Sequence, residues 1–217
     1  DYWVEENLMG SLIPGPDGTS YGHVDHHYSA RVFTLGPQGD VEWWWDGTYF
    51  YEGKLFLASN NHIYAANRNE MTSGVIDRYD VEEQGLMLES RMEFFEETGN
   101  GGDPGAPLIE LANGYMYGTG GTGGINEGGV IYRFRHDGSG FEVVHYFDEV
   151  GSGIGPYSGL TEYNGFLYGA TLYGGEEGNR GTIFRIRPDG TEFTKLHDFN
   201  GINGAHPEAE LTVMENV

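Results

Sequence analysis

Hydrophobic and polar positions in this chain alternate in short runs that are typical of β-strands. In the run 182–187, Phe184 and Ile186 alternate with Arg185 and Arg187, which gives the segment two unlike faces. Such runs end at turns in which glycine follows asparagine or aspartate, the residues that tight turns favour. Signals for amphipathic helices are missing throughout. The pattern therefore predicts an all-β protein.

The predicted strands recur in a long repeat. Residues 113–147 and 164–199 align almost without gaps, and Asn-Gly, Tyr-Gly and Asp-Gly pairs fall at matching positions. The period of 51 or 52 residues lies within the range of β-propeller blades. Each copy contains enough alternating runs for four strands. In the last copy we expect them at about 158–163, 166–172, 182–187 and 191–199.

Two weaker copies are predicted upstream. In the first, residues 17–22 match the segment that contains Asn-Gly and Tyr-Gly, and residues 31–35 match the following strand. In the second, residues 52–56 open the copy and residues 75–79 continue it. The sequence thus predicts a single β-propeller or propeller fragment over residues 1–217. Its blades are expected at about 8–47, 48–100, 101–150 and 151–200, with a partial fifth blade at 201–217.

The two ends of the chain allow two interpretations of how the ring closes. Residues 206–214 look like the first strand of a fifth copy, and residues 1–6 resemble the last strand of a preceding one. Either the two ends pair to close a ring, or the chain is a piece of a larger propeller. The second interpretation is favoured because the second and third strands of a fifth blade have no counterpart at the N-terminus.

Charge narrows the choice of partners. The chain has 34 acidic and 11 basic residues, which gives a formal net charge of −23. We therefore expect no nucleic-acid partner, because a polyanion would be repelled. No apolar run reaches 18 residues, so we expect no membrane insertion either. The acidity also suits a high-salt extracellular setting, where ions screen self-repulsion. The absence of cysteine excludes disulfides without fixing the compartment.

The repeat carries a family resemblance. Its pattern is Asn-Gly-x-(Leu/Met)-Tyr-Gly, a Gly-Gly loop, Gly-(Thr/Val)-Ile-(Phe/Tyr)-Arg, Asp-Gly and a terminal Phe. This pattern resembles the bacterial Gloeo_Verruco-type tandem repeat, specifically over residues 101–200 and loosely over 8–100. The resemblance implies a secreted or surface-displayed protein, so we expect an extracellular or cell-surface location. It implies no particular chemistry.

The first two copies depart from the repeat pattern, and their expected loops hold the candidate functional residues. Gly22–Ala30, predicted to connect the second and third strands of copy one, contains three of the eight histidines. The corresponding loop of copy two is expected to carry Asn61 and His62, followed by Tyr64. His206 enters at the crossover after copy four. If these loops share one face, their imidazoles converge on the mouth of a central channel.

Several interpretations of these loops stay open, the simplest being a polar loop with partly exposed histidines. A metal site would use imidazole nitrogens and a carboxylate, namely His23 and Asp25 with His26 or His27. A weaker likeness to propeller-fold polysaccharide lyases implies acid–base chemistry on a uronate. Its residues would be His26 or His27 as base, Tyr28 or Tyr64 as acid, and Arg31 or Arg68 to neutralise the carboxylate.

Two further features suggest ligands. The run Trp43–Trp45 offers a platform for sugar stacking, with Trp44 as the candidate contact, although strand packing must use at least one of these rings. In the Gly-rich loops, Glu127, Glu176, Glu177 and Asn179 offer oxygen ligands for calcium, although a solvated acidic loop is the simpler interpretation. We therefore predict a surface propeller that binds a glycan or a surface protein through its loop face. The alternatives are a polysaccharide lyase acting by β-elimination and a structural module of a surface assembly.

Overall fold

The structure is a computed structural model. It describes residues 7–8, 12–15, 17–26, 29–44, 51–68, 73–82, 85–94, 99–176 and 178–214. Within these ranges, the side chains of residues 7–8, 25–26, 29–31, 44, 51–53, 68, 82 and 85–87 are outside the description. The described segments form strands and turns only, and none forms a helix of the length and apolarity needed to cross a membrane.

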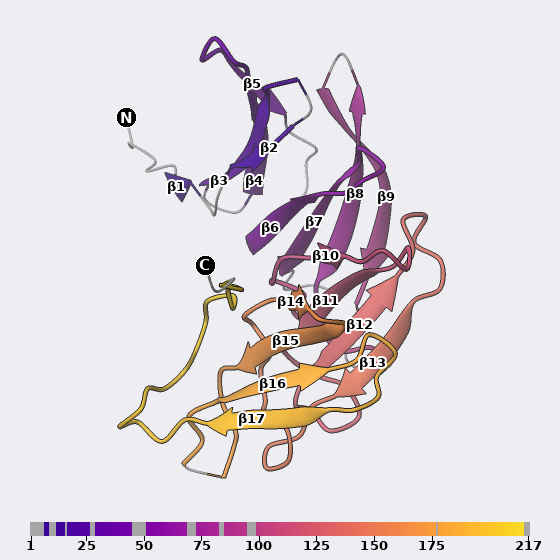
Figure 1. The fold of residues 1–217 in the computed structure, drawn as a ribbon. Coiled ribbons are helices and arrows are strands. Elements are labelled where there is room, and N and C mark those ends of the chain that lie inside the picture. Colours follow the sequence, from indigo (N-terminus) through magenta and orange to yellow (C-terminus); the bar gives the residue numbers. More distant parts are fainter. Residues whose placement is uncertain are drawn as a thin grey trace.

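The strands form four antiparallel sheets, numbered 1 to 4 along the chain (Figure 1). Sheet 1 contains β1 (Asn7–Leu8), β2 (Ile13–Pro14), β3 (Ser20–His26), β4 (Ser29–Leu35) and β5 (Val41–Trp44). Sheet 2 contains β6 (Tyr51–Leu57), β7 (Ile63–Arg68), β8 (Val75–Glu82) and β9 (Gly85–Glu93). Sheet 3 contains β10 (Ile109–Glu110), β11 (Met116–Gly120), β12 (Val130–Phe134) and β13 (Glu142–Tyr146). Sheet 4 contains β14 (Thr161–Tyr163), β15 (Phe166–Thr171), β16 (Thr182–Ile186) and β17 (Thr194–Asp198).

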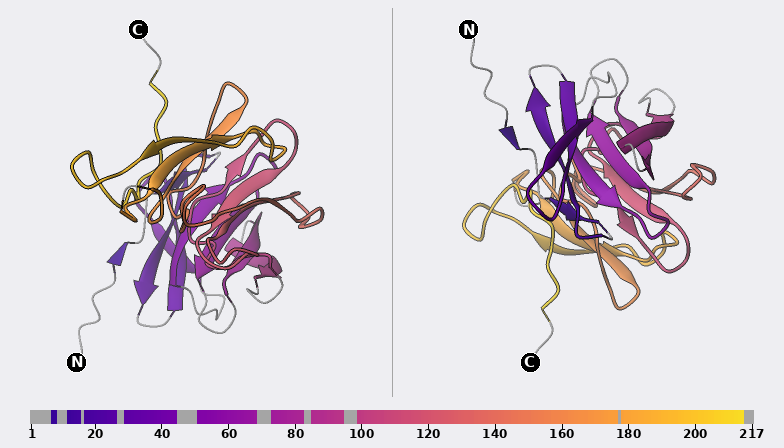
Figure 2. Two further views of the ribbon diagram at one scale, coloured as in Figure 1. Left: turned by 90° about the horizontal axis from the view of Figure 1, so that it is seen from below. Right: turned by 90° about the horizontal axis from the view of Figure 1, so that it is seen from above.

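The all-β, propeller-type architecture predicted from the repeat is confirmed. In sheets 2 to 4 each strand pairs with the next one along the chain, whereas β1 and β2 of sheet 1 both pair with β3. The sheets follow one another in a curved row, with sheets 1 and 4 at its two ends (Figure 1). The two views of Figure 2 show the same order from below and from above. The row is open, so the sheets do not form a closed barrel.

Apolar clusters fill the space between successive sheets. Alternate side chains of a strand point to opposite faces, so each inner sheet contributes one face to each neighbour. Sheets 1 and 2 bury Tyr21, Val32, Ile63, Ala65 and Tyr79. Sheets 2 and 3 bury Tyr64, Ala66, Ile76, Met116, Tyr132 and Phe134. Sheets 3 and 4 bury Tyr117, Ile131, Leu167, Phe184 and Ile186.

A tyrosine–arginine pair binds sheet 3 to the turn that joins the last two strands of sheet 4. Tyr117 lies opposite Arg133 in the register of β11 and β12. The Tyr117 hydroxyl donates to the carbonyl oxygen of Pro188 at 3.1 Å, and Arg133 Nη1 donates to the same oxygen at 3.2 Å. Asn113 Nδ2 donates to the Tyr117 hydroxyl at 2.9 Å. This shared acceptor fixes the position of one sheet against the next.

The same contact joins sheets 2 and 3. Tyr64 lies opposite Arg78, and both donate to the carbonyl oxygen of His136, at 2.8 Å and 2.5 Å. Asn60 Nδ2 lies 3.5 Å from the Tyr64 hydroxyl, as Asn113 lies beside Tyr117. The repeat therefore encodes a contact between sheets as well as a fold within each sheet.

This contact corrects the predicted alignment of copy two. Residues 52–56 lie in β6, the first strand of sheet 2, and do not follow a hairpin turn. The turn is formed by residues 58–62, where Ala58 N donates to the His62 carbonyl as Leu111 N donates to that of Tyr115. The recurring aromatic position is thus held by Tyr64, and no residue of 52–56 corresponds to Tyr117. Residues 75–79, which were expected to continue the copy, lie in β8, the third strand of sheet 2.

Residues 206–214 begin a fifth copy without forming the expected strand. His206 has φ +51°, and the matching residues Asp103 and Gly155 have φ +58° and +69°. His206 N donates to the Arg180 carbonyl at 2.8 Å, and the Thr161 hydroxyl donates to the Leu211 carbonyl at 2.5 Å. The segment lies against sheet 4 but forms no ladder. In the other copies the first strand pairs with the second strand of its own sheet, and none of the described residues supplies that partner.

His145 makes stability depend on pH. Its ring stacks on Phe193 of sheet 4 with centroids 4.2 Å apart, and burial lowers its pKa to about 4. The unfolded chain takes up a proton below a pH of about 6.5, whereas the folded chain resists it. His145 therefore favours folding fully above that pH, and the advantage is lost as the pH falls towards 4. We expect it to account for at most about 3 kcal/mol of unfolding free energy over this range.

Urea denaturation at several pH values tests this expectation. Because carboxylates also titrate at acid pH, the His145→Gln variant is the comparison, and its unfolding free energy should fall less steeply. Parallel pH profiles of the two proteins would contradict the assignment.

Candidate functional site

A pocket of about 460 Å³ lies where the segments that begin the successive repeats come together. It receives residues from sheets 1 and 2, from the segments that precede β10 and β14, and from the segment 206–214. We refer to it as the axial pocket. Its lining consists of Ile13, His23, Lys54, Leu55, Pro107, Tyr157, Ser158, Glu208, Ala209 and Glu210. Apolar surface is mixed with one lysine and two carboxylates.

One repeat position brings three different side chains to this pocket. The turn hydrogen bonds align Lys54 with Pro107, and the same register places Glu210 and Gly159 at the corresponding positions of later copies. An added Cβ at Gly159 would lie 2.9 Å from Glu210 Oε1, so the glycine leaves room for that carboxylate. The packing positions repeat their residue types, whereas this position changes from copy to copy. The change gives the pocket an uneven distribution of charge.

Glu210 and Lys54 set the electrostatics of the pocket. Burial raises the pKa of the Glu210 carboxyl, and the nearby charge of Lys54 lowers it in part. Lys54 is the only lysine or arginine among the described residues of the lining. Ser158 has its hydroxyl occupied, since it accepts from Ala170 N at 2.9 Å and lies 3.2 Å from the Ala170 carbonyl. The Ser158 hydroxyl is therefore already engaged within sheet 4 and the segment that precedes it.

Tyr157 joins the pocket to the loop between the second and third strands of sheet 3. Its ring lies against Gly121, where an added Cβ would overlap the ring. Leu172 N, from the corresponding loop of sheet 4, donates to the Gly155 carbonyl at 2.8 Å two residues before Tyr157. The aromatic side of the pocket is thus held between two loops of the predicted loop face.

The side chains predicted to converge on one channel mouth lie in different elements of the structure. His23 lies in β3, is 6% exposed and lines the axial pocket. His206 lies at the crossover, as expected, with Nδ1 2.9 Å from the Leu172 carbonyl. Asn61 and His62 lie in the turn between the first two strands of sheet 2, where His62 Nε2 is 3.0 Å from Glu89 Oε2. Tyr64 is buried in the contact with sheet 3.

The predicted loop Gly22–Ala30 is also corrected. Residues 20–26 and 29–35 form paired strands, because Val24 and its neighbours continue the ladder to the hairpin. Only residues 27–28 are left to connect them, and His27 and Tyr28 lie outside the described residues. The strands β3, β4 and β5 contain further predicted residues whose side chains are outside the description, namely Asp25, His26, Arg31 and Trp44.

No metal cluster is found among the side chains that the structure describes. No three histidine or acidic side chains there lie close enough to hold an ion. In the loop predicted to offer calcium ligands, Asn179 Oδ1 accepts from Gly174 N at 2.6 Å and Glu176 pairs with Lys195 at 3.2 Å. Both side chains are therefore already engaged within sheet 4.

A comparison with known protein families identifies the family of this chain. The model of the Gloeobacter/Verrucomicrobia repeat matches residues 9–217. The chain belongs to this repeat family. No curated protein sequence matches this member of the Gloeobacter/Verrucomicrobia repeat family. The family resemblance predicted from the Asn-Gly and Asp-Gly pattern is therefore confirmed over nearly the whole chain, including the two divergent copies.

Solved structures show the same propeller-like fold as this Gloeobacter/Verrucomicrobia repeat protein. Virginiamycin B lyase from Staphylococcus aureus has a TM-score of 0.56 and 17% identity over 93% of this chain and 61% of its own. A putative 6-phosphogluconolactonase from Bacteroides uniformis has a TM-score of 0.58 and 14% identity, over 94% and 57%. A putative TolB from Agrobacterium tumefaciens has a TM-score of 0.51 and 16% identity, over 90% and 64%. The chain spans less than two thirds of each, and at these identities the likeness concerns the fold alone.

Proposed function

We propose that this protein binds a neutral carbohydrate in the axial pocket. The observation that carries the proposal is the lining itself, which combines a tyrosine ring with Lys54, Glu208 and Glu210. A sugar has an apolar ring face and a rim of hydroxyl groups, so it is matched by an aromatic surface beside charged hydrogen-bonding groups. Lysine donates to hydroxyl oxygens, and carboxylates accept from hydroxyl hydrogens.

Charge favours a neutral ligand over an acidic one. Two carboxylates and one lysine line the pocket, and the chain as a whole carries −23. A polyuronate would be repelled on approach and inside the pocket, whereas hydroxyl groups can use carboxylate acceptors. This argument favours binding over the lyase alternative, which requires an acidic glycan.

Titration calorimetry with neutral and acidic oligosaccharides tests the proposal. We expect saturable binding of a neutral oligosaccharide, and Lys54→Met should weaken it by about tenfold, the loss of roughly 1.4 kcal/mol. Lys195→Met is the matched control because Lys195 lies on the last strand, in ion pairs with Glu176 and Asp198. The Lys195→Met variant should bind the neutral oligosaccharide with unchanged affinity.

Three results would contradict the proposal. These are a failure of every neutral oligosaccharide to bind, a preference for acidic ones, and an equal loss of affinity in the two lysine variants. Release of unsaturated products from a uronate polysaccharide would instead support the lyase alternative.

A further inference from the structure

Sheet 4 has a face that repeats a contact surface, and none of the described residues takes the place of the following sheet there. Leu167, Phe184 and Ile186 pack towards sheet 3, so the alternate residues of β15 and β16 lie on the opposite face. We call this the open face of sheet 4 and define it by Phe166, Tyr168, Ile183 and Arg185. All four side chains are partly exposed to solvent.

The open face has the side chains of the contact between sheets 3 and 4. Tyr168 lies opposite Arg185 in register, as Tyr117 lies opposite Arg133. Arg185 lies 4.6 Å from the centre of the Phe166 ring, and Arg133 lies 4.7 Å from that of Tyr115. Tyr117 and Arg133 bind a turn carbonyl of the following sheet, whereas no such carbonyl reaches Tyr168 or Arg185 within the described residues.

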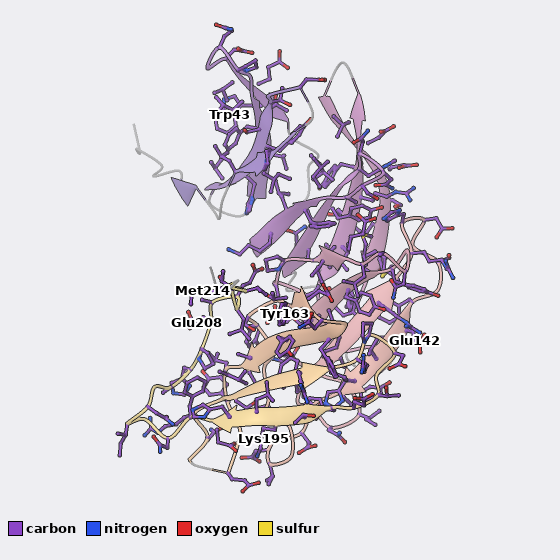
Figure 3. The ribbon with its side chains drawn as sticks, viewed as in Figure 1. Trp43, Glu142, Tyr163, Lys195, Glu208 and Met214 are labelled. Carbon is purple, nitrogen blue, oxygen red and sulfur yellow. The ribbon has the colours of Figure 1, made fainter. Side chains whose placement is uncertain are left out.

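Sheet 1, at the other end of the row, presents the complementary half of this contact. Phe33 pairs in register with Trp43, as Tyr132 pairs with Val143 on the face of sheet 3 that packs against sheet 2. Trp43 is 49% exposed and Val41 43% exposed, although the matching residues of sheet 3, Val143 and Phe141, pack against sheet 2. Figure 3 shows Trp43 at the end of the row opposite to Lys195 of sheet 4.

Sheet 1 also has the required turn. Gly36 N donates to the Asp40 carbonyl at 2.8 Å, as Arg187 N donates to that of Thr191 at 2.9 Å. This register places the exposed Pro37 at the position of Pro188, whose carbonyl accepts from Tyr117 and Arg133. The two ends of one chain therefore carry the two halves of the contact that is formed between its inner sheets.

We propose that the open face of sheet 4 binds sheet 1 of a second copy of this chain. Tyr168 and Arg185 would donate to the Pro37 carbonyl of the partner copy, and Ile183 would pack against its apolar face. The contact is head-to-tail, so each copy uses a different surface. Residues 206–214 already lie at the inner edge of sheet 4, through Thr161, so the incoming sheet makes its contact through β3 to β5.

A closed pair of copies would contain eight sheets, which lies within the range of propellers, typically 4–8 blades. Each chain carries a net charge of −23, so long-range repulsion opposes association at low ionic strength. Association should therefore be stronger at high salt. The proposal is independent of the axial pocket and stands whether or not that pocket binds a carbohydrate.

Sedimentation velocity of the full chain over a wide concentration range, at high salt, tests the proposal. We expect a concentration-dependent increase in mass. Arg185→Glu removes one half of the contact and Trp43→Glu the other, and each variant should weaken self-association by at least about tenfold. Tyr168→Phe and Val41→Lys alter the same two surfaces and should also weaken self-association. Circular dichroism verifies that each variant is folded.

Mixing the two variants distinguishes this contact from any other. The Arg185→Glu protein keeps an intact sheet 1, and the Trp43→Glu protein keeps an intact open face. Each should be monomeric alone, and a mixture should form heterodimers through the one remaining pair of surfaces. A monomeric wild type at every concentration, self-association that survives both variants, or a mixture that stays monomeric would overturn the proposal.

Discussion

Replacing Tyr117 by alanine is expected to lower the free energy of unfolding by about 3–5 kcal/mol. The ring is fully buried between sheets 3 and 4, so its removal leaves a cavity. Its hydroxyl also donates to the Pro188 carbonyl and accepts from Asn113. The substitution therefore removes apolar packing and the hydrogen bond that joins two sheets.

The chain contains its own control for this substitution. Tyr168 occupies the same repeat position on sheet 4, where no described sheet follows. Tyr168→Ala should cost less than about 1 kcal/mol in a dilute sample, in which the chain is monomeric. Urea denaturation of both variants measures the difference. Equal losses would show that the tyrosine acts within its own sheet and not between sheets.

Gly129→Ala is expected to be nearly as damaging, costing more than about 3 kcal/mol. Gly129 has φ +93°, a conformation that a side chain disfavours. An added Cβ would also lie 2.5 Å from the Gly120 carbonyl oxygen and 2.6 Å from Pro156 Cδ. Both neighbours are held in place, one by the strand ladder and the other by its ring, so neither can move at low cost.

Gly114→Ala separates strain from overlap. Gly114 has φ +79°, but an added Cβ would meet no atom within 4 Å beyond its chain neighbours, so only the backbone conformation is penalised. Gly114→Ala should therefore lower the free energy of unfolding by about 1 kcal/mol. Thermal unfolding of the two variants provides the comparison. A loss at Gly129 no larger than that at Gly114 would refute the close approach of sheet 3 to the crossover.

The fold of the last two copies was predictable because their turns determine the register. Asn164 and Gly165 both have positive φ and form the tight hairpin that the Asn-Gly pair predicts. The second and third strands then follow at residues 166–171 and 182–186, within one residue of expectation. Once a turn is located, the pleat assigns every residue to a face.

Copy two was misaligned because its turn lacks the expected glycine. Asn61 has φ +62°, a left-handed conformation that asparagine tolerates better than most residues. The pair Glu52-Gly53 therefore resembled the Asn-Gly turn more closely than Asn60-Asn61 did. The error assigned Tyr64 to a ligand site, although it is the packing tyrosine of the repeat. It also hid the equivalence of Lys54 with Pro107 and Glu210.

The axial pocket could not be predicted from local patterns. Lys54 and Pro107 are one repeat apart in sequence and Pro107 and Glu210 are two, and they meet only because the row of sheets is curved. One feature of the sequence could have indicated the pocket. At a single repeat position, next to the recurring apolar residues, the residue type changes from copy to copy. This feature becomes visible only when all copies are aligned correctly, and the misplacement of residues 52–56 prevented that alignment.

The two lysines of the chain allow a direct test of the proposed binding site. Lys54 lines the axial pocket, and Lys195 lies in ion pairs on the last strand of sheet 4 (Figure 3). A protein labelled only at lysine gives one NMR reporter inside the pocket and one far from it. Titration with a neutral oligosaccharide should shift the Lys54 signal saturably and leave the Lys195 signal in place. A Lys54 signal that stays unchanged while the sugar binds would place the ligand elsewhere and contradict the account.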